Sequence, residues 1–467
     1  MLESLGQNRW TIDSGSDDTV DPIVYANDVV KPQLEPQSLQ QLRNAARLRG
    51  VVHVAGMPDL HVGYGVPVGS NLVMDADEGL ISAGAVGMDI NCGMRLLSSD
   101  VLSDSVDRST VKSFARQISK VIPLGIGTTS PHQDELSSEI EDVLVKGVPH
   151  LKSLGYARED DLRRIQDGGS FDGADPSKLP EDAWDRLDQL GTLGGGNHFI
   201  EVDEIDEIYA PTEAEAYGLK EGRLSVMIHT GSRGLGHQIC TDYSGRMLEA
   251  SPRFELEFPD DQLAAAPIQS SLGHEYYGAM AAAANIAYAN RQVIAYDIRQ
   301  LFENLVGTQS DALRTVYDIT HNLARFETVD DRDVLTHRKG AIRSLPPGHP
   351  DNPEAYREVG HPIIVPGNMA TGSYVLRATP AARETFHTVN HGAGRTMSRR
   401  QAKRTLTPKA LKKRMEDIVL LGTAYDDLLD EAPMAYKELD PVIETLTEIG
   451  LVEKVARLKP RAVIKGD

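Results

Sequence analysis

Residues 87–93 read Gly-Met-Asp-Ile-Asn-Cys-Gly and place Asp89 three positions before Cys92, one of only two cysteines in 467 residues. A thiolate and a carboxylate this close together, on a turn bracketed by glycines, are typical of metal ligands. Cysteine favours soft or borderline ions, aspartate favours harder ones, and one sulfur can bridge two ions when imidazoles complete the shells. A metal centre at this turn would therefore need histidines from other segments.

Four other segments place a histidine where an apolar strand meets small residues. A strand end holds a ligand stiffly while the adjoining loop shapes a cavity. One such histidine is more often a hydrogen-bonded core residue than a ligand, but four of them together with Asp89 and Cys92 predict a metal centre. The segments are residues 191–202 with His198, 224–237 with His229, 313–322 with His321, and 385–395 with His391.

Two glycine-rich stretches could either let the backbone approach a ligand closely or form simple turns. The run at 191–196 leads into a strand, whereas a dinucleotide fingerprint follows a strand and opens a helix, so that fingerprint is a poor match. No phosphate-binding Gly-x-x-x-x-Gly-Lys motif occurs either. In residues 57–70, Asp59 and His61 alternate with glycine and proline, and we expect a string of turns there.

Composition narrows the class of protein. The mean hydropathy is -0.32, and no apolar run approaches the roughly 18 residues that a membrane span needs. Residues 1–30 are polar and contain no secretory signal, and two cysteines do not make a disulfide framework. We therefore expect a cytoplasmic protein in a reducing compartment, with Cys240 as an ordinary buried thiol.

The net charge of 48 minus 69, or -21, argues by itself against a nucleic-acid-binding protein. Residues 395–414 nevertheless carry many basic side chains and no acidic one. This basic segment could bind phosphates or be the solvated face of a helix. Its candidate phosphate-binding residues are Arg395, Arg399, Arg400, Lys403 and Arg404.

The pattern of apolar residues predicts one large mixed α/β domain over 51–467, in which central sheets deliver ligands from their strand ends and helices lie outside. Residues 1–50 should be a polar lead-in, irregular to 37 and then a short helix over 38–48. Residues 157–190 should form a surface excursion. Helices are expected over 105–122, 135–146 and 274–305 and over most of 407–428, and a docked terminal strand should fix Lys465.

Several long motifs in one order resemble the RtcB family of RNA-splicing and repair ligases. The resemblance runs from Met57 to Asp467, and so many motifs in order are far more specific than one glycine-rich run. The motifs are MPDLH, GAVGMDINCG, GTLGGGNHFIEV, HTGSRGLG, YYGAMAAAANIAYANRQ, THNLARFE, HRKGA, HGAGRTMSR and VIKG.

The resemblance implies a layered RtcB-like fold, two Mn²⁺ ions and GTP. Cys92 would bridge the ions, with His229 and His321 on one and Asp89 and His198 on the other. His391 would attack the α-phosphate of GTP and carry GMP, a role that suits an imidazole at neutral pH. The implied nucleotide pocket comprises Asn197, His198, Phe199, Ile200, Glu201, His321, Asn322, Pro366, Gly367, Asn368, Met369, Ser373, His391, Gly392, Ala393, Gly394, Tyr436 and, at the guanine, Lys465.

The family's reaction joins an RNA 3′-phosphate or 2′,3′-cyclic phosphate to a 5′-hydroxyl through an RNA(3′)pp(5′)G intermediate, in tRNA splicing or RNA repair. RNA is the implied partner, and an archease-type activator is a candidate partner. Two alternatives belong to other classes. A metal-dependent phosphoesterase or cyclic phosphodiesterase would need the metals but not His391 or Lys465, and a non-enzymatic RNA-binding protein would need only residues 395–414.

Overall fold

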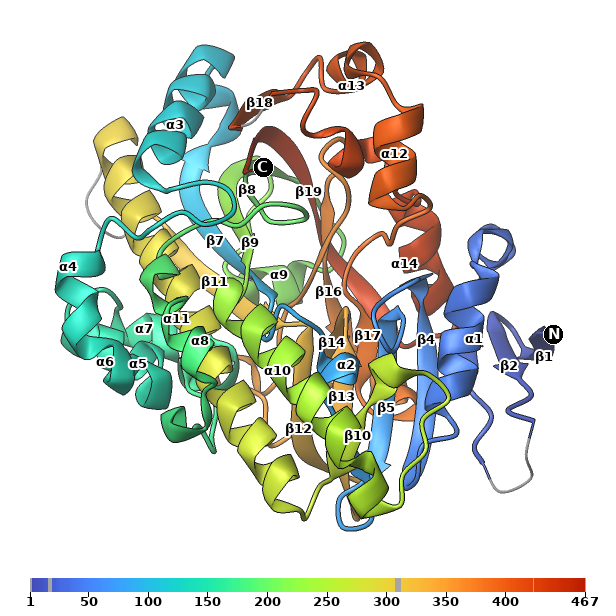
Figure 1. Ribbon diagram of the computed structural model, residues 1–467. Helices are drawn as coiled ribbons and strands as arrows, with labels where there is room; N and C mark the ends of the chain where they lie inside the picture. Colours follow the sequence, from blue (N-terminus) through green and yellow to red (C-terminus); the bar gives the residue numbers. More distant parts are fainter. Residues whose placement is uncertain (1, 16–18, 307–311, 423, 467) are drawn as a thin grey trace.

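The computed structural model describes residues 2–15, 19–306, 312–422 and 424–466, and it confirms a mixed α/β fold with helices around central sheets (Figure 1). Met1, 16–18, 307–311, 423 and Asp467 belong to the predicted ranges 1–50 and 51–467 but lie outside the described residues. Helices α4 to α8 and α11 lie along one side of the molecule, and the N-terminal strands lie on the other (Figure 1).

A seven-stranded sheet contains the N-terminal part of the chain. Residues 1–37 were expected to be irregular, but three short strands add to the edge of β4, and the Trp10 indole anchors them by donating to Ala26 O at 2.8 Å. The expected string of turns at 57–70 is confirmed only for 62–67, because β4 continues to His61 and the next strand begins at Val68. The strand order is β1 (Leu2–Gly6), β2 (Arg9–Ile12), β3 (Ile23–Tyr25), β4 (Val51–His61), β5 (Val68–Asp75), β13 (Arg332–Lys339) and β12 (Asn322–Val329).

An eight-stranded sheet lies at the centre. Its strands run β11 (Arg314–Thr320), β7 (Gly93–Leu102), β9 (Arg223–Thr230), β8 (Phe199–Ile208), β19 (Val452–Lys465), β16 (Ser373–Ala378) and β15 (Ile363–Pro366), with β18 (Val419–Gly422) paired to β19. The docked terminal strand is confirmed, since β19 pairs with β8 and Lys465 is 2% exposed. Residues 407–428 are not mostly helical, because β18 lies parallel to β19. Two small sheets pair β6 (Leu80–Ser82) with β10 (Ala265–Pro267) and β14 (Ala341–Arg343) with β17 (Thr388–Asn390).

Helices cover the sheets, and the 36-residue helix α11 is central to their packing. The amides of Asn285 and Asn290 on α11 are satisfied core polar groups: Asn285 accepts from Phe171 N at 2.6 Å and Asn290 from Gly191 N at 2.7 Å. Every helix among the described residues is too short or too polar to cross a bilayer. The helices are α1 (Pro36–Ala45), α2 (Ala83–Val86), α3 (Arg108–Val121), α4 (Gln133–Leu136), α5 (Ile140–Lys146), α6 (Val148–Ser153), α7 (Glu159–Leu162), α8 (Glu181–Trp184), α9 (Pro211–Tyr217), α10 (Gly234–Ala250), α11 (Ser271–Val306), α12 (Arg399–Thr405), α13 (Pro408–Arg414) and α14 (Leu439–Glu448).

Residues 157–190, expected as a surface excursion, are in fact pinned to α11 at several points. The buried carboxylate of Asp161 accepts from Arg299 Nη2 at 2.6 Å and from Arg299 Nη1 at 2.8 Å. The main-chain amide of Phe171 donates to Asn285 on the same helix. The segment is therefore a chain of short turns that contributes buried polar contacts as well as surface.

A fully buried ion cluster ties α11 to the central sheet. Asp318 on β11 accepts from Arg95 Nε at 2.7 Å and from Arg291 Nη2 at 2.8 Å, and all three side chains are 0% exposed. Arg291 Nη1 also donates to Asn91 O at 2.8 Å and to Thr230 O at 2.9 Å. The cluster thus holds the 87–93 turn against the end of β9.

Asp318→Ala should lower the free energy of unfolding by about 3–5 kcal/mol, because it leaves two guanidinium groups buried without a carboxylate. Urea denaturation followed by circular dichroism measures this loss. Asp100→Ala is the control, since Asp100 pairs with Lys220 at 2.7 Å on the surface and should cost about 0–1 kcal/mol. Equal losses in the two variants would contradict the role assigned to the cluster.

Candidate active site

The five predicted metal ligands meet at one edge of the eight-stranded sheet. Strands β11, β7, β9 and β8 are antiparallel neighbours, so two of them end where the other two begin. His321 follows the end of β11 and His229 lies at the end of β9, whereas Cys92 precedes the start of β7 and His198 precedes the start of β8. Register alone therefore gathers ligands from residues that are far apart in sequence.

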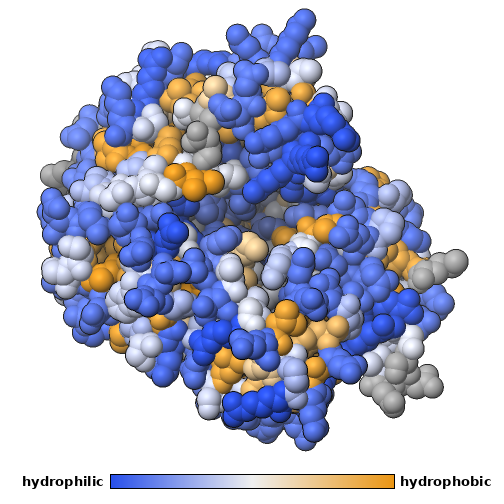
Figure 2. All heavy atoms as spheres, in the orientation of Figure 1, coloured by the Kyte–Doolittle hydropathy of each residue, from blue (hydrophilic) through white to orange (hydrophobic). Residues whose placement is uncertain are grey.

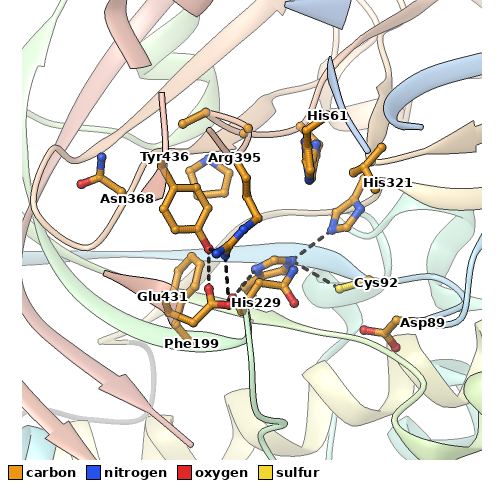
Figure 3. Close-up of a pocket in the computed structure, with 18 of the residues that line it drawn as sticks. His61, Asp89, Cys92, Phe199, His229, His321, Asn368, Arg395, Glu431 and Tyr436 are labelled. Atoms are coloured by element: carbon orange, nitrogen blue, oxygen red, sulfur yellow. Dashed lines mark hydrogen bonds and ion pairs between the residues drawn. The ribbon is translucent and has the colours of Figure 1, made fainter. Parts of the chain in front are cut away.

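Cys92 belongs to two sets of potential ligands. One set is Cys92, His229 and His321, the other is Asp89, Cys92 and His198, and the donor atoms in each set lie within 4.8 Å of one another. The Cys92 sulfur is 3.3 Å from His229 Nε2 (Figure 3). It is 3.4 Å from His198 Nε2. His198 Nε2 lies 2.7 Å from Asp89 Oδ2. These distances suit a sulfur shared between two ions.

Hydrogen bonds to the far side of each imidazole fix which nitrogen carries a proton. His229 Nδ1 lies 3.2 Å from Asn197 O, which can only accept, so its Nε2 carries a lone pair. The Asn322 amide is oriented because its oxygen accepts from Gly340 N and its nitrogen donates to Asp89 O. His321 Nδ1 donates to that oxygen, which leaves a lone pair on Nε2 as well.

The two lone pairs face each other, because the Nε2 atoms of His229 and His321 are only 3.0 Å apart. Burial lowers the pKa of both histidines well below 6.5, so both rings are neutral. Burial also raises the pKa of the Cys92 thiol. This arrangement of donors without protons is repulsive by itself and fits a bound cation, which would also favour the thiolate.

Two glycines are required where the backbone passes the ligands. A Cβ on Gly194 would lie 2.0 Å from His198 Nδ1, and one on Gly231 would lie 2.4 Å from Asp89 Oδ1. Any side chain at either position would displace a ligand. The glycine-rich runs of the sequence therefore give the ligands room and do not form a dinucleotide-binding turn.

His391 lies beside this cluster, with its ring centroid 4.6 Å from that of His321. Its Nδ1 donates to Asp59 Oδ2 at 2.7 Å, and the main-chain amides of His391 and Gly392 donate to the same oxygen at 3.0 and 3.2 Å. The bond to Asp59 fixes the tautomer and leaves Nε2 with the lone pair that a nucleophile needs. Sequence reasoning noted Asp59 but gave it no role.

Comparison with known proteins agrees with this geometry. The family model described as "tRNA-splicing ligase RtcB" matches residues 41–466. The chain belongs to the RtcB family. It is 41% identical over 455 residues to the tRNA-splicing ligase RtcB of Thermococcus kodakarensis, covering 95% of this chain and 94% of the relative. It is 42% identical over 435 residues to the RNA-splicing ligase RtcB of Mycobacterium tuberculosis, covering 91% and 100%.

The family expected from the motifs is thus confirmed, and the members it matches are enzymes. Identity to the tRNA-splicing ligase RtcB of Nanoarchaeum equitans is 38% over 478 residues, covering 100% of this chain and 99% of the relative. The agreement is therefore not confined to the motifs around the ligands. It includes the N-terminal strands, which the motif comparison had left out.

Most residues of the implied nucleotide pocket line one cavity of about 280 Å³ that also reaches the metal ligands. Figure 3 shows Asp89 and Cys92 at one end of it and Asn368 and Tyr436 at the other. The predicted residues in its wall are Asn197, Phe199, Glu201, His321, Asn322, Pro366, Gly367, Asn368, Met369, His391, Gly392, Ala393, Gly394, Tyr436 and Lys465.

Three predicted pocket residues are not in the cavity wall. Ile200 points to the opposite face of β8, because side chains alternate along a strand, and it packs in the apolar cluster with Ile228. Ser373 lies behind the wall and accepts from Gly367 N at 3.4 Å. His198 is turned toward Asp89 and Cys92.

A buried acid at the far end of the cavity was missed. Glu431 is 3% exposed, accepts from the Tyr436 hydroxyl, and lies 4.0 Å from Lys465 Nζ and 3.3 Å from Arg395 Nη1. Burial alone would raise the pKa of Glu431, but Lys465, Arg395 and Arg399 more than offset it and hold the pKa below its ordinary value. The acid therefore stays charged and orders the cations around it.

The basic segment divides into an inner and an outer part. Arg395 lines the cavity and donates to the Tyr436 hydroxyl at 3.0 Å, so it does not belong to an exposed patch. Arg399 reaches Glu431 at 3.3 Å from α12. Arg400, Lys403 and Arg404 are exposed, and the surface over α12 is strongly hydrophilic beside the hollow on the face shown in Figure 2.

Proposed function

We propose that the protein is an RNA ligase of the cytoplasm that uses GTP and Mn²⁺ to join RNA 3′-phosphate or 2′,3′-cyclic phosphate ends to 5′-hydroxyl ends. The observation that carries the proposal is His391, whose Nε2 lone pair is set by Asp59 next to two donor sets that share Cys92. A phosphoesterase that activates water on its metal ions needs the donor sets but not an imidazole nucleophile. The substrates are intron-cleaved tRNA or broken RNA, and an archease-type activator is part of the proposal.

Cys92, His229 and His321 would hold one ion, and Asp89, Cys92 and His198 would hold the other. Bound Mn²⁺ supplies positive charge that neutralises the triphosphate and its leaving group. The thiolate, imidazole and carboxylate ligands accept a borderline divalent ion. Arg233, the first residue before α10, reaches Thr192 Oγ1 at 3.1 Å beside this site and adds a fixed positive charge.

In the first step His391 Nε2 attacks the α-phosphorus of GTP, so that an N–P bond forms and the bond to pyrophosphate breaks. The ring then carries a positive charge, which the Asp59 carboxylate stabilises through Nδ1. A 2′,3′-cyclic end is first opened by water, which breaks the P–O2′ bond and leaves a 3′-phosphate and a 2′-hydroxyl. An oxygen of the RNA 3′-phosphate next attacks the phosphorus on Nε2, and the imidazole leaves as a neutral ring. Finally the 5′-hydroxyl attacks the activated RNA phosphate and expels GMP.

The Glu431 end of the cavity would bind the guanine base. Burial lowers the pKa of Lys465, while Glu431 and Glu201 partly oppose this effect. The ammonium group can donate to the guanine carbonyl oxygen, where adenine carries an amino group instead. Tyr436 and Phe199 add aromatic surface to the same end.

Incubation of the pure protein with Mn²⁺ and GTP tests the proposal by intact mass. The expected result is a covalent GMP adduct on the wild-type chain, none on His391→Ala, and joining of an RNA 3′-phosphate to a 5′-hydroxyl by the wild type alone. An RNA end trimmed to a 3′-phosphate without an adduct would instead support a phosphoesterase. An adduct that survives His391→Ala would refute the assignment of the nucleophile.

The exposed part of the basic segment should bind the RNA backbone. Arg400→Gln with Arg404→Gln should weaken RNA binding more at low salt than at high salt, because each phosphate contact releases counterions. Fluorescence anisotropy at several salt concentrations measures the slope, which should fall by about two units for two lost contacts. Lys146→Gln with Lys152→Gln is the control, since these exposed lysines lie on α5 and α6 across the molecule. A loss that does not depend on salt would mean that α12 has a structural role.

A further inference from the structure

Resting on the ligase function, we propose that His61 is the acid–base group of the sealing step and takes the proton of the RNA 5′-hydroxyl. The O5′–H bond breaks as its proton moves to His61 Nε2, and the O5′–P bond forms. The P–O bond to GMP breaks, and its electron pair leaves on the GMP phosphate. The proton is released to water in the next turnover, so no further reactant is needed.

The geometry of His61 fixes its tautomer. Its Nδ1 lies 2.9 Å from the main-chain oxygen of Asp59, which can only accept, so Nδ1 carries the proton. Nε2 therefore carries a lone pair, and no hydrogen-bond partner for it exists among the described residues. His61 is half-buried in the cavity wall, on the same side as His321 in Figure 3. A preset acceptor nitrogen is thus exposed to the space where the substrates must react.

Asp59 orients two imidazoles at once. Its side chain holds His391 Nδ1 and its main-chain oxygen holds His61 Nδ1. A Cβ on Gly394 would lie 2.2 Å from that main-chain oxygen, so the third residue after His391 must be glycine for both contacts to exist. One residue consequently orients both rings, and both line the same cavity.

The remaining bases of the cavity are committed elsewhere. Among the described residues, His229 and His321 line the cavity as members of the donor sets, and His391 carries GMP. Glu201 lies toward Lys465, and burial raises its pKa well above the ordinary value, with Asp203 acting in the same direction. A protonated carboxyl cannot accept the proton of the 5′-hydroxyl. Asp89 and Cys92 belong to the donor sets, and Glu431 is held by Lys465 and Arg395 at the far end of the cavity. That leaves His61.

Burial, more than the neighbouring charges, keeps His61 neutral until RNA arrives. Burial lowers the pKa of His61 to about 4, the bond to Asp59 opposes this, and His391 and Lys437 add to the lowering. The phosphates of a bound RNA end carry negative charge, which shifts the pKa back toward neutrality. The imidazole therefore becomes a stronger base when both RNA ends are in the cavity.

The test separates sealing from guanylylation in the full-length protein. His61→Asn keeps an amide that can donate to Asp59 O but has no atom at the position of Nε2. We expect GMP adduct formation with Mn²⁺ and GTP within about twofold of the wild type, because Asp59 and His391 stay in place. Sealing of an RNA that already carries the 3′-ppG cap to a 5′-hydroxyl RNA should fall by about 100-fold or more under single-turnover conditions.

Two further measurements distinguish a chemical role from a structural one. The acidic limb of the pH–rate profile for sealing should be present in the wild type and flat in His61→Asn. Free imidazole should restore sealing by His61→Ala, in which the cavity has space for it. His53→Asn, on the same strand but outside the cavity wall, is the matched control and should seal normally.

Sealing by His61→Asn at the wild-type rate would overturn the inference. So would an equal loss of adduct formation and sealing, because that result would mean that His61 acts only by supporting Asp59. If the wild type forms no adduct at all, the proposed ligase function itself fails and the role of His61 fails with it.

Discussion

Replacing Cys92 with serine should remove both metal ions and reduce every chemical step to background. The Cys92 sulfur is the one donor atom shared by the two sets, and it lies within 3.4 Å of His198 and His229. A serine hydroxyl stays protonated at neutral pH and cannot replace a bridging thiolate. Elemental analysis of manganese per chain, together with thermal unfolding with and without Mn²⁺, measures the loss.

Variants of the other candidate ligands test whether Cys92 alone is shared by the two ions. His198→Ala should lose the ion of its own set and His321→Ala the ion of the other, so each should keep about half of the manganese. Cys240→Ser is the control, since that buried thiol donates to Ala83 O at 3.5 Å, outside both donor sets. Undiminished manganese in Cys92→Ser would show that the sulfur does not bridge.

Asp59 variants should slow guanylylation strongly while leaving the metal content unchanged. Three donors converge on Asp59 Oδ2, and Oδ1 has no hydrogen-bond partner among the described residues. An asparagine can therefore place its oxygen at Oδ2 and keep the tautomer of His391 while removing the charge. We expect Asp59→Asn to form the GMP adduct about 10²-fold more slowly and Asp59→Ala about 10⁴-fold more slowly, because alanine also loses the tautomer.

Single-turnover mass spectrometry of the adduct measures both rates. Either variant could also destabilise the fold through Lys437. Its ammonium group donates to Pro58 O and Leu60 O beside Asp59, and it loses a nearby negative charge when Asp59 is replaced. Thermal unfolding shows whether that loss destabilises the protein. If asparagine proves as slow as alanine in a folded protein, the charge matters and the tautomer does not.

The clustering of the five candidate ligands could be predicted from the sequence, because it follows from their residue types and their places at strand ends. Asp59, His61 and Glu431 could not be assigned roles in that way. The contact between Asp59 and His391 joins residues 332 positions apart, and its meaning appears only when both strands are in place. The same holds for Glu431. The sequence does not distinguish it from the other acidic residues, and only the fold shows its contacts with Lys465 and Arg395.

Two of the errors in secondary structure have the same cause. Strands β1 to β3 and β18 are short, and their sequences lack a clear alternation. They become strands because a neighbour offers unpaired backbone groups: β3 pairs with β4, β2 and then β1 add to β3, and β18 pairs with β19. The local sequence pattern does not show whether such a neighbouring strand exists.

Ile200 was assigned to the nucleotide pocket through the motif, although the alternation of side chains along β8 places its side chain on the other face of the sheet.

The place of β19 between β8 and β16 sets an order of events during synthesis. All members of the two donor sets lie between residues 89 and 321, on a block of four strands that is complete before β15, β16 and β19 leave the ribosome. The two donor sets can thus come together before Glu431 and Lys465 are synthesised. Until β19 inserts, β8 and β16 present open edges that could pair with other chains. Insertion of β19 therefore covers the open edges of β8 and β16 in the newly synthesised chain. The same insertion brings Lys465 into the cavity wall.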